Sequence, residues 1–205
     1  CTFGFIARST IFPILFLAKS SQEHLRAFSS RLGHITNHRF NMKFRGKMTD
    51  LISIRKFYNI LGTMAKLAKT CVLRLNSDKF YFILTEVGSF SGGPSVWCEM
   101  EQSHFFNEYN LEGVTKEDNE IYLELEPDKL AKTLNSLKSS SAKSLKIKLT
   151  RKHESPCLSF EIEMSALADN TRVCVHDVPV SLIPRRLWND FQEPEMEAFD
   201  VSIYL

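Results

Sequence analysis

The stretch MKFRGKMTDLISIRKFYNILGTMAKLAK, residues 42–69, reads as a short strand that runs directly into an amphipathic helix. Positions from Met42 to Met48 alternate between apolar or glycine residues and cations, which is the period of two that a strand requires. Apolar residues then recur every three or four positions from Leu51 to Ala68, and Thr49 or Asp50 can cap the helix. The sequence therefore predicts one strand–helix unit here.

A second unit of the same kind lies at EIYLELEPDKLAKTLNSLK, residues 120–138. Its strand alternates through Ile121 to Leu125, and Pro127 then opens a helix with an apolar stripe that includes Leu130 and Leu134. Two strand–helix halves among many strands indicate a pseudo-symmetric α+β domain rather than an enzyme built on a catalytic motif.

Alternating or apolar runs predict further strands between and after these units. We expect strands at 71–76, 79–85, 95–101, 109–114, 145–150, 158–165 and 172–179. Asn76-Ser-Asp is typical of a hairpin turn, 89–94 is a Gly/Pro loop, and 138–144 is a Ser/Lys linker.

Three segments together resemble the sliding-clamp family to which PCNA belongs. They are MKFRGKMTD at 42–50, KFYNILGTMAKLAKTCVLRL at 56–75 and SFEIEMSALADNTRVCVHDVPVSLIPRRLW at 159–188. Within that family the chain is most similar to the hydroxyurea-sensitivity subunits of the heterotrimeric nine-one-one checkpoint clamp, from Met42 to its last residue. The resemblance implies a PCNA-like fold in which helices line a DNA channel and sheets face outward.

The same resemblance suggests a domain organisation. Residues 42–184 are expected to form a first clamp domain, 185–198 an interdomain connector, and 199–205 the first strand of a truncated second clamp domain. Residues 1–41 do not resemble the family. We interpret them as a poorly ordered extension translated upstream of a start at Met42, or as an alternative first exon. The other interpretation is a targeting peptide, because the segment is basic and carries an apolar run from Ile11 to Ala18.

Charge and cysteine content narrow the classes of function. Residues 1–41 hold five Lys/Arg and one Glu, so the rest of the chain carries 21 basic and 23 acidic residues. This balance excludes a uniformly basic nucleic-acid binder, and any phosphate contact must come from a local cluster. The five cysteines include no CxxC, which favours buried free thiols in a reducing compartment. No apolar run reaches the roughly 20 residues that a membrane span needs.

The outward faces of the two helices are the candidate nucleic-acid surface. On the first helix this face carries Ile52, Lys56, Asn59, Thr63 and Lys66; on the second it carries Asp128, Lys132, Asn135 and Ser139, flanked by Lys129 and Lys138. By the resemblance, we expect the DNA-binding residues to be Lys56, Asn59, Lys66, Lys129, Lys132 and Lys138. Such contacts would be to phosphate and independent of base sequence. Without the resemblance these would be ordinary solvated lysines, and Asp128 departs from a basic lining.

The connector is the candidate partner-binding segment. Arg185, Arg186, Trp188 and Phe191 lie in the polar stretch between Pro184 and Pro194. The alternatives are that Trp188 packs on the domain's own sheet, or that the segment stacks on nucleic acid.

Two rival chemistries are visible. A zinc site could be built from His153, Cys157, Cys174 and His176, although Pro156 interrupts the first pair and the spacing matches no known finger. Cys157 with His153 could form a nucleophile pair, but the sequence shows no third, orienting group. We therefore expect no catalytic residue, metal or cofactor.

The predicted function is that of a non-catalytic subunit of a ring that encircles DNA and scaffolds checkpoint and repair factors. The implied partners are two other clamp subunits, a clamp loader, double-stranded DNA without sequence preference, and repair enzymes, with no membrane. The expected location is the nucleus, with the cytoplasm as a second compartment. The alternatives are an organelle-targeted or secreted enzyme, with residues 1–41 as targeting peptide, and a small zinc-binding module.

Overall fold

The computed structural model describes residues 3–5, 42–84, 96–138, 142–165 and 171–193. Two antiparallel sheets and a pair of helices make up this part of the chain. The elements are β1 (Phe3–Phe5), β2 (Lys43–Met48), α2 (Leu51–Leu67), β3 (Cys71–Leu75), β4 (Lys79–Leu84), β5 (Val96–Glu101), η1 (Gln102–His104), β6 (Glu108–Glu112), β7 (Ile121–Leu125), α3 (Pro127–Thr133), η2 (Leu134–Lys138), β8 (Ala142–Lys152), β9 (Ser155–Ser165), β10 (Thr171–Pro179), β11 (Ser181–Leu182) and η3 (Arg185–Phe191).

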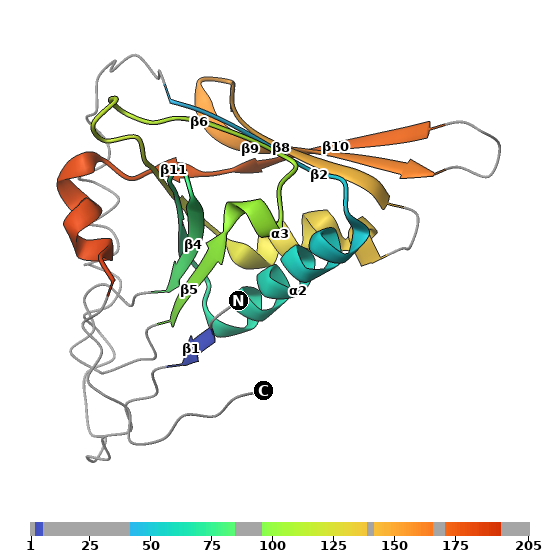
Figure 1. The fold of residues 1–205 in the computed structure, drawn as a ribbon, viewed down its shortest axis with the longest axis horizontal. Helices are drawn as coiled ribbons and strands as arrows, with labels where there is room; N and C mark the ends of the chain where they lie inside the picture. The colour runs from blue at the N-terminus through green and yellow to red at the C-terminus, as the bar shows by residue number, and fades with distance from the viewer. Residues whose placement is uncertain (1–2, 6–41, 85–95, 139–141, 166–170, 194–205) are drawn as a thin grey trace.

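The two sheets meet at an angle, and α2 and α3 fill the space between them (Figure 1). The six-stranded sheet has the order β1-β5-β4-β3-β7-β11, and the five-stranded sheet has the order β10-β9-β8-β2-β6. The helices contact each other, α2 also contacts β2 and β8, and α3 contacts β10. The short helix η3 lies on the opposite face of the six-stranded sheet (Figure 1). The described domain is therefore layered, with helices on one side and the connector on the other.

The two predicted strand–helix units are present as β2–α2 and β7–α3. Each unit contributes its strand to a different sheet, and the two helices lie side by side. This arrangement confirms the α+β prediction and explains the repeat, since each half supplies one strand to a sheet and one helix to the shared core.

Local chemistry accounts for the start of α2. The carboxylate of Asp50 accepts hydrogen bonds from the backbone N–H and the hydroxyl of Ser53, both at 2.8 Å. Asp50 is therefore the N-cap that the sequence suggested. Ile54 and Leu61 of the apolar stripe are fully buried, and Phe57 and Met64, which widen the stripe on one side, are buried with them. Ile60 is buried as well, because α2 packs against both sheets.

Aromatic side chains fill the space between α2 and the sheets. The Phe80 ring meets the rings of Phe105 and Phe106 edge-on, with centroids 5.3 and 5.4 Å apart. A Cβ at Gly46 would lie 2.6 Å from the Phe106 ring. Glycine in β2 is thus the residue that leaves room for this ring.

Several predicted boundaries need correction. The Ser/Lys linker does not extend to residue 144, because β8 already begins at the buried Ala142. The second helix is α-helical only to Thr133 and continues as the 3₁₀ turn η2. Phe3–Phe5 form β1, which pairs antiparallel with β5. An edge strand offers unpaired backbone groups that such a segment can satisfy.

The predicted loop at 89–94 and the predicted strand at 199–205 lie outside the described residues. Among the cysteines that the structure describes, Cys71, Cys98 and Cys157 are buried and free, and Cys174 is partly buried. Burial raises the pKa of the Cys71 thiol to about 12 and that of Cys98 to about 11, so both are unreactive thiols. Within the described ranges, no helix combines the length and apolar character needed to cross a bilayer.

Candidate nucleic-acid interface and connector

The outward face of α2 is exposed as its helical spacing predicts. This holds for all five residues assigned to it, namely Ile52, Lys56, Asn59, Thr63 and Lys66. The helix contains three cations, Arg55, Lys56 and Lys66, and no acidic residue. Its exposed side is therefore positively charged, although the domain as a whole is not.

Two further cations, Arg55 and Lys69, are exposed on or just after α2. Neither belongs to the candidate surface predicted from helical spacing. The sequence feature that would have added them is that α2 contains cations but no acidic residue, so that its whole exposed side is positively charged.

The second helix differs from the expected basic lining. The ammonium of Lys129 lies 2.6 Å from Glu126, and that of Lys132 lies 2.7 Å from Asp128. Pairs of this kind are exposed and contribute about 0–1 kcal/mol, but they cancel most of the local positive charge. Asp128 thus neutralises the lysine one turn away. The side chain of Lys138 is not among those described, and a DNA contact by any of the three lysines stays a prediction.

A small cleft opens where the two helices face each other. It is lined by Tyr58, Ala131, Lys132 and Asn135, with a volume of about 290 Å³. The Tyr58 hydroxyl donates a 3.4 Å hydrogen bond to the side-chain oxygen of Asn135. This contact joins α2 to η2, so the helices present one continuous surface.

The connector is held against the six-stranded sheet by two aromatic residues. The indole of Trp188 stacks on the ring of Tyr122, with centroids 4.5 Å apart and planes 22° apart. The indole N–H donates a 2.9 Å hydrogen bond to the carbonyl oxygen of Ile183. Trp188 and Phe191 are both buried in a second apolar cluster that includes Tyr122.

The partner-binding role of the connector stays a prediction, and the structure shows where its aromatic side chains lie. In the docked position Trp188 and Phe191 belong to the domain's own core, as the alternative interpretation of Trp188 held. Arg185 and Arg186 are exposed. Whether either arginine binds a partner is not tested by the fold and stays a prediction.

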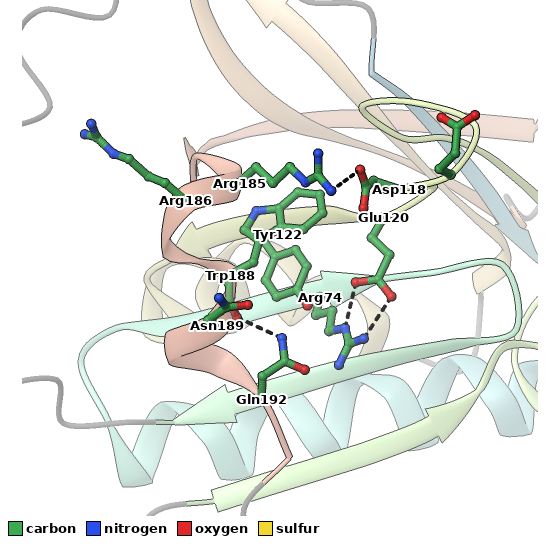
Figure 2. Close-up of a pocket in the computed structure, with 10 residues that line it drawn as sticks. Arg74, Asp118, Glu120, Tyr122, Arg185, Arg186, Trp188, Asn189 and Gln192 are labelled. Carbon is green, nitrogen blue, oxygen red and sulfur yellow. Dashed lines mark hydrogen bonds and ion pairs between the residues drawn. The ribbon is translucent and has the colours of Figure 1, made fainter.

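A pocket of about 550 Å³ lies beside the connector (Figure 2). Its base is Arg74, which donates hydrogen bonds of 3.1 and 2.8 Å to Glu120, with its guanidinium 5.0 Å from the centre of the Tyr81 ring. At its rim Arg185 points to Asp118, with nitrogen and oxygen 2.6 Å apart, whereas Arg186 points away (Figure 2). The pocket is therefore polar, and its charges are largely paired.

The zinc hypothesis is wrong for this fold. In the β9–β10 pairing Cys157 lies opposite Pro179, and Cys174 lies opposite Ile162. Paired residues share a face and successive residues alternate, so the two cysteines lie on opposite faces of the sheet. His153 sits in the β8–β9 turn. Across the described residues, no three His, Cys, Asp or Glu side chains gather in a metal-binding group.

Two antiparallel sheets with paired internal helices and an outer connector define an α+β domain of the PCNA-like clamp type. Comparison with known proteins makes this assignment specific. The sequence profile described as Hus1-like protein matches residues 42–205. The chain therefore belongs to the Hus1-like protein family, in agreement with the resemblance seen in its sequence.

The chain is similar to curated members of that family from distant organisms. It is 48% identical over 164 residues to "Checkpoint protein HUS1" of Homo sapiens, covering 80% of this chain and 57% of the relative. Identity is 33% over 165 residues to "Checkpoint protein Hus1-like" of Drosophila melanogaster, covering 80% and 59%. Identity is 24% over 164 residues to "Checkpoint protein hus1" of Schizosaccharomyces pombe, covering 80% and 54%. The chain thus spans less than three-fifths of the length of these relatives.

Proposed function

We propose that this chain is a non-catalytic subunit of a ring-shaped checkpoint clamp that encircles DNA and scaffolds signalling and repair factors. The observation that carries the proposal is the exposed face of α2, which has three cations and no acid in a domain of the Hus1-like family. The names of its relatives as checkpoint proteins support the same role.

The charge on α2 suits contact with phosphate. Lys56 and Lys66 lie on one exposed face with Asn59 between them, and Arg55 flanks it. Long cationic side chains neutralise phosphates without reading bases, which permits a ring to move along double-stranded DNA. On α3, Lys129 and Lys132 would contribute after exchanging their intrahelical carboxylates for phosphate.

Strand β10 supports contact with a neighbouring clamp subunit. It pairs with β9 on one side and is an edge of the five-stranded sheet among the described strands. Val173 and Val175 on this strand are 58% and 54% exposed. An edge with exposed β-branched residues suits the addition of a strand from another chain. The two other clamp subunits are the partners this proposal implies, together with a clamp loader, repair enzymes and a nuclear location.

Salt-dependent DNA binding tests the assignment of α2. The double variant Lys56→Ala/Lys66→Ala of the full chain should bind double-stranded DNA more weakly than wild type at low salt. Its plot of log affinity against log salt concentration should be less steep by about one unit per lost phosphate contact.

The matched control is Lys116→Ala/Lys143→Ala, which removes two exposed lysines outside the helices. We expect this control to bind DNA like wild type. Equal binding by the α2 variant and wild type, or equal losses in both variants, would contradict the assignment of α2 as the DNA-facing helix.

A further inference from the structure

The loop between β6 and β7 presents an exposed threonine close to the connector. The Thr115 hydroxyl accepts a 3.0 Å hydrogen bond from the Asp118 backbone N–H and lies 3.4 Å from the Asp118 carboxylate oxygen Oδ2. That same oxygen lies 2.6 Å from Nη2 of Arg185. Since the 3.4 Å and 2.6 Å contacts share this atom, the threonine oxygen is no more than 6.0 Å from the guanidinium.

Of the two adjacent arginines at the start of the connector, only Arg185 forms an ion pair with the loop among those found in the described ranges. Arg185 and Arg186 are adjacent and exposed, and Arg185 pairs with Asp118. Arg186 points away from the pocket in Figure 2, and none of the ion pairs found in the described ranges includes it. A phosphate monoester carries a charge of about −1.5 to −2 at neutral pH and can accept hydrogen bonds from two guanidinium groups. A phosphate on this loop would therefore offer acceptor oxygens that both arginines can share.

The residues that follow Thr115 suit a particular class of modifying enzyme. Glu117, Asp118 and Glu120 place acids two, three and five positions after the hydroxyl. A serine/threonine kinase with a basic substrate groove selects acceptors by such charge complementarity. The loop is closed by a 2.7 Å hydrogen bond from the Gly113 N–H to the Asn119 side chain, which holds Thr115 on its exposed rim.

We propose that Thr115 is a phosphorylation site and that its phosphate latches the β6–β7 loop to the connector through Arg185 and Arg186. In the modifying step the Thr115 oxygen attacks the γ-phosphorus of ATP on an acid-directed serine/threonine kinase. The bond from that phosphorus to the β-phosphate oxygen breaks, ADP leaves, and the hydroxyl proton passes to the kinase's base. Arg185 then exchanges Asp118 for the phosphate, which carries the larger negative charge, and the exposed Arg186 side chain turns from the position in Figure 2 to join it.

The latch adds a second attachment to the connector. Trp188 and Phe191 already hold its middle and end against the sheet. The phosphate would hold its first turn from the loop side, and the connector would open less often. This inference does not depend on whether the domain encircles DNA.

Phosphorylation of the full chain tests the site. Wild type is incubated with a purified acid-directed serine/threonine kinase and magnesium ATP, and phosphopeptides are located by mass spectrometry. We expect phosphate at Thr115 and its loss from that peptide in Thr115→Val. An unmodified Thr115 in wild type, while the kinase phosphorylates a control peptide, would overturn the proposal.

Hydrogen exchange tests the latch separately. In phosphorylated wild type the amides of 185–193 should exchange about tenfold more slowly than in the unmodified chain, because new charge-assisted hydrogen bonds hold the segment. In Arg185→Gln/Arg186→Gln, phosphorylation at Thr115 should leave this exchange unchanged. Equal slowing in both chains, or no slowing in wild type, would refute the role of the two arginines.

Discussion

Replacing Gly62 by alanine should stabilise the domain. Gly62 lies in the interior of α2, and a Cβ built there meets no atom within 4 Å. Alanine is more favourable than glycine inside a helix by about 0.5–1 kcal/mol, and no clash offsets that gain here. For a domain of roughly 150–250 residues, 1 kcal/mol moves the melting temperature by about 2–4 °C. We therefore expect a rise of about 1–4 °C.

The same substitution at Gly113 should have the opposite effect. A Cβ there would lie 2.4 Å from the backbone nitrogen of Glu120 and 2.6 Å from the carbonyl carbon of Asn119. These are backbone atoms, so they cannot rotate away, and the loop must open. Opening also loses the 2.7 Å hydrogen bond from Gly113 N–H to Asn119. We expect a cost of about 1–3 kcal/mol, typical of overpacking at a tight contact.

Thermal unfolding followed by circular dichroism measures both variants against wild type, and urea unfolding gives the free energies. The two variants control for each other because they make the same chemical change in the same domain. A lower melting temperature for Gly62→Ala would show that the flank of α2 is more crowded than the structure has it. An unchanged melting temperature for Gly113→Ala would refute the close approach of the two loop ends.

Three further predictions concern the core, a turn and an ion pair. Leu61→Asp should leave the domain unfolded, as measured by circular dichroism, because Leu61 is fully buried. An unpaired carboxylate there costs several kcal/mol, whereas the whole free energy of unfolding of a domain is about 5–15 kcal/mol. A melting curve like that of wild type would contradict this. His153 and Glu154 form a two-residue hairpin turn in which both have positive φ, 47° and 66°, and Asn-Gly is the sequence that such a turn favours. His153→Asn/Glu154→Gly should therefore raise the free energy of unfolding by about 1 kcal/mol and the urea midpoint with it. A lower midpoint would argue against that turn. Hydrogen bonds from Lys148 and Lys146 of β8 lower the pKa of Glu161 from 4.5, so the stability they provide is present above pH 4.5 and is lost as the pH falls through the lowered value. Glu161→Gln should therefore have a lower free energy of unfolding than wild type at pH 7, and this difference should shrink in acid. Urea titrations of both proteins at pH 7 and in acid measure it, and a difference that does not change with pH would contradict the ion pair.

Elements governed by neighbouring residues were predictable from the chain. The cap at Asp50 follows from side-chain chemistry within one helical turn, and the alternation in β2 follows from the geometry of a strand. The exposed face of α2 followed in the same way, because helical spacing places Lys56 and Lys66 on one side. The pairing of Lys132 with Asp128 has the same local origin, because the two residues are four positions apart on one helix, and the sequence already marks Asp128 as a departure from a basic lining.

Whether the connector docks on the six-stranded sheet could not be predicted from neighbouring residues. Trp188 is 66 positions from Tyr122, and the sequence pattern of a polar stretch between two prolines does not say whether the segment docks. Its burial depends on the apolar outer surface that β3, β4 and β7 create when they lie next to one another. The sequence therefore offered the docking of Trp188 only as an alternative to a partner-binding role, because its stacking partner Tyr122 is remote in the chain.

The sequence by itself determined the α+β class, the two strand–helix units and most strand positions, since periodicity and capping are properties of neighbouring residues. The resemblance of three longer segments to the clamp family indicated the family. Only the tertiary structure decided that Cys157 and Cys174 lie on opposite faces, that the connector is docked, and that Thr115 lies near Arg185. Each of these placements involves residues that are far apart in the chain. Their proximity depends on the order of strands in each sheet and on which surfaces pack together, and no local pattern carries that information.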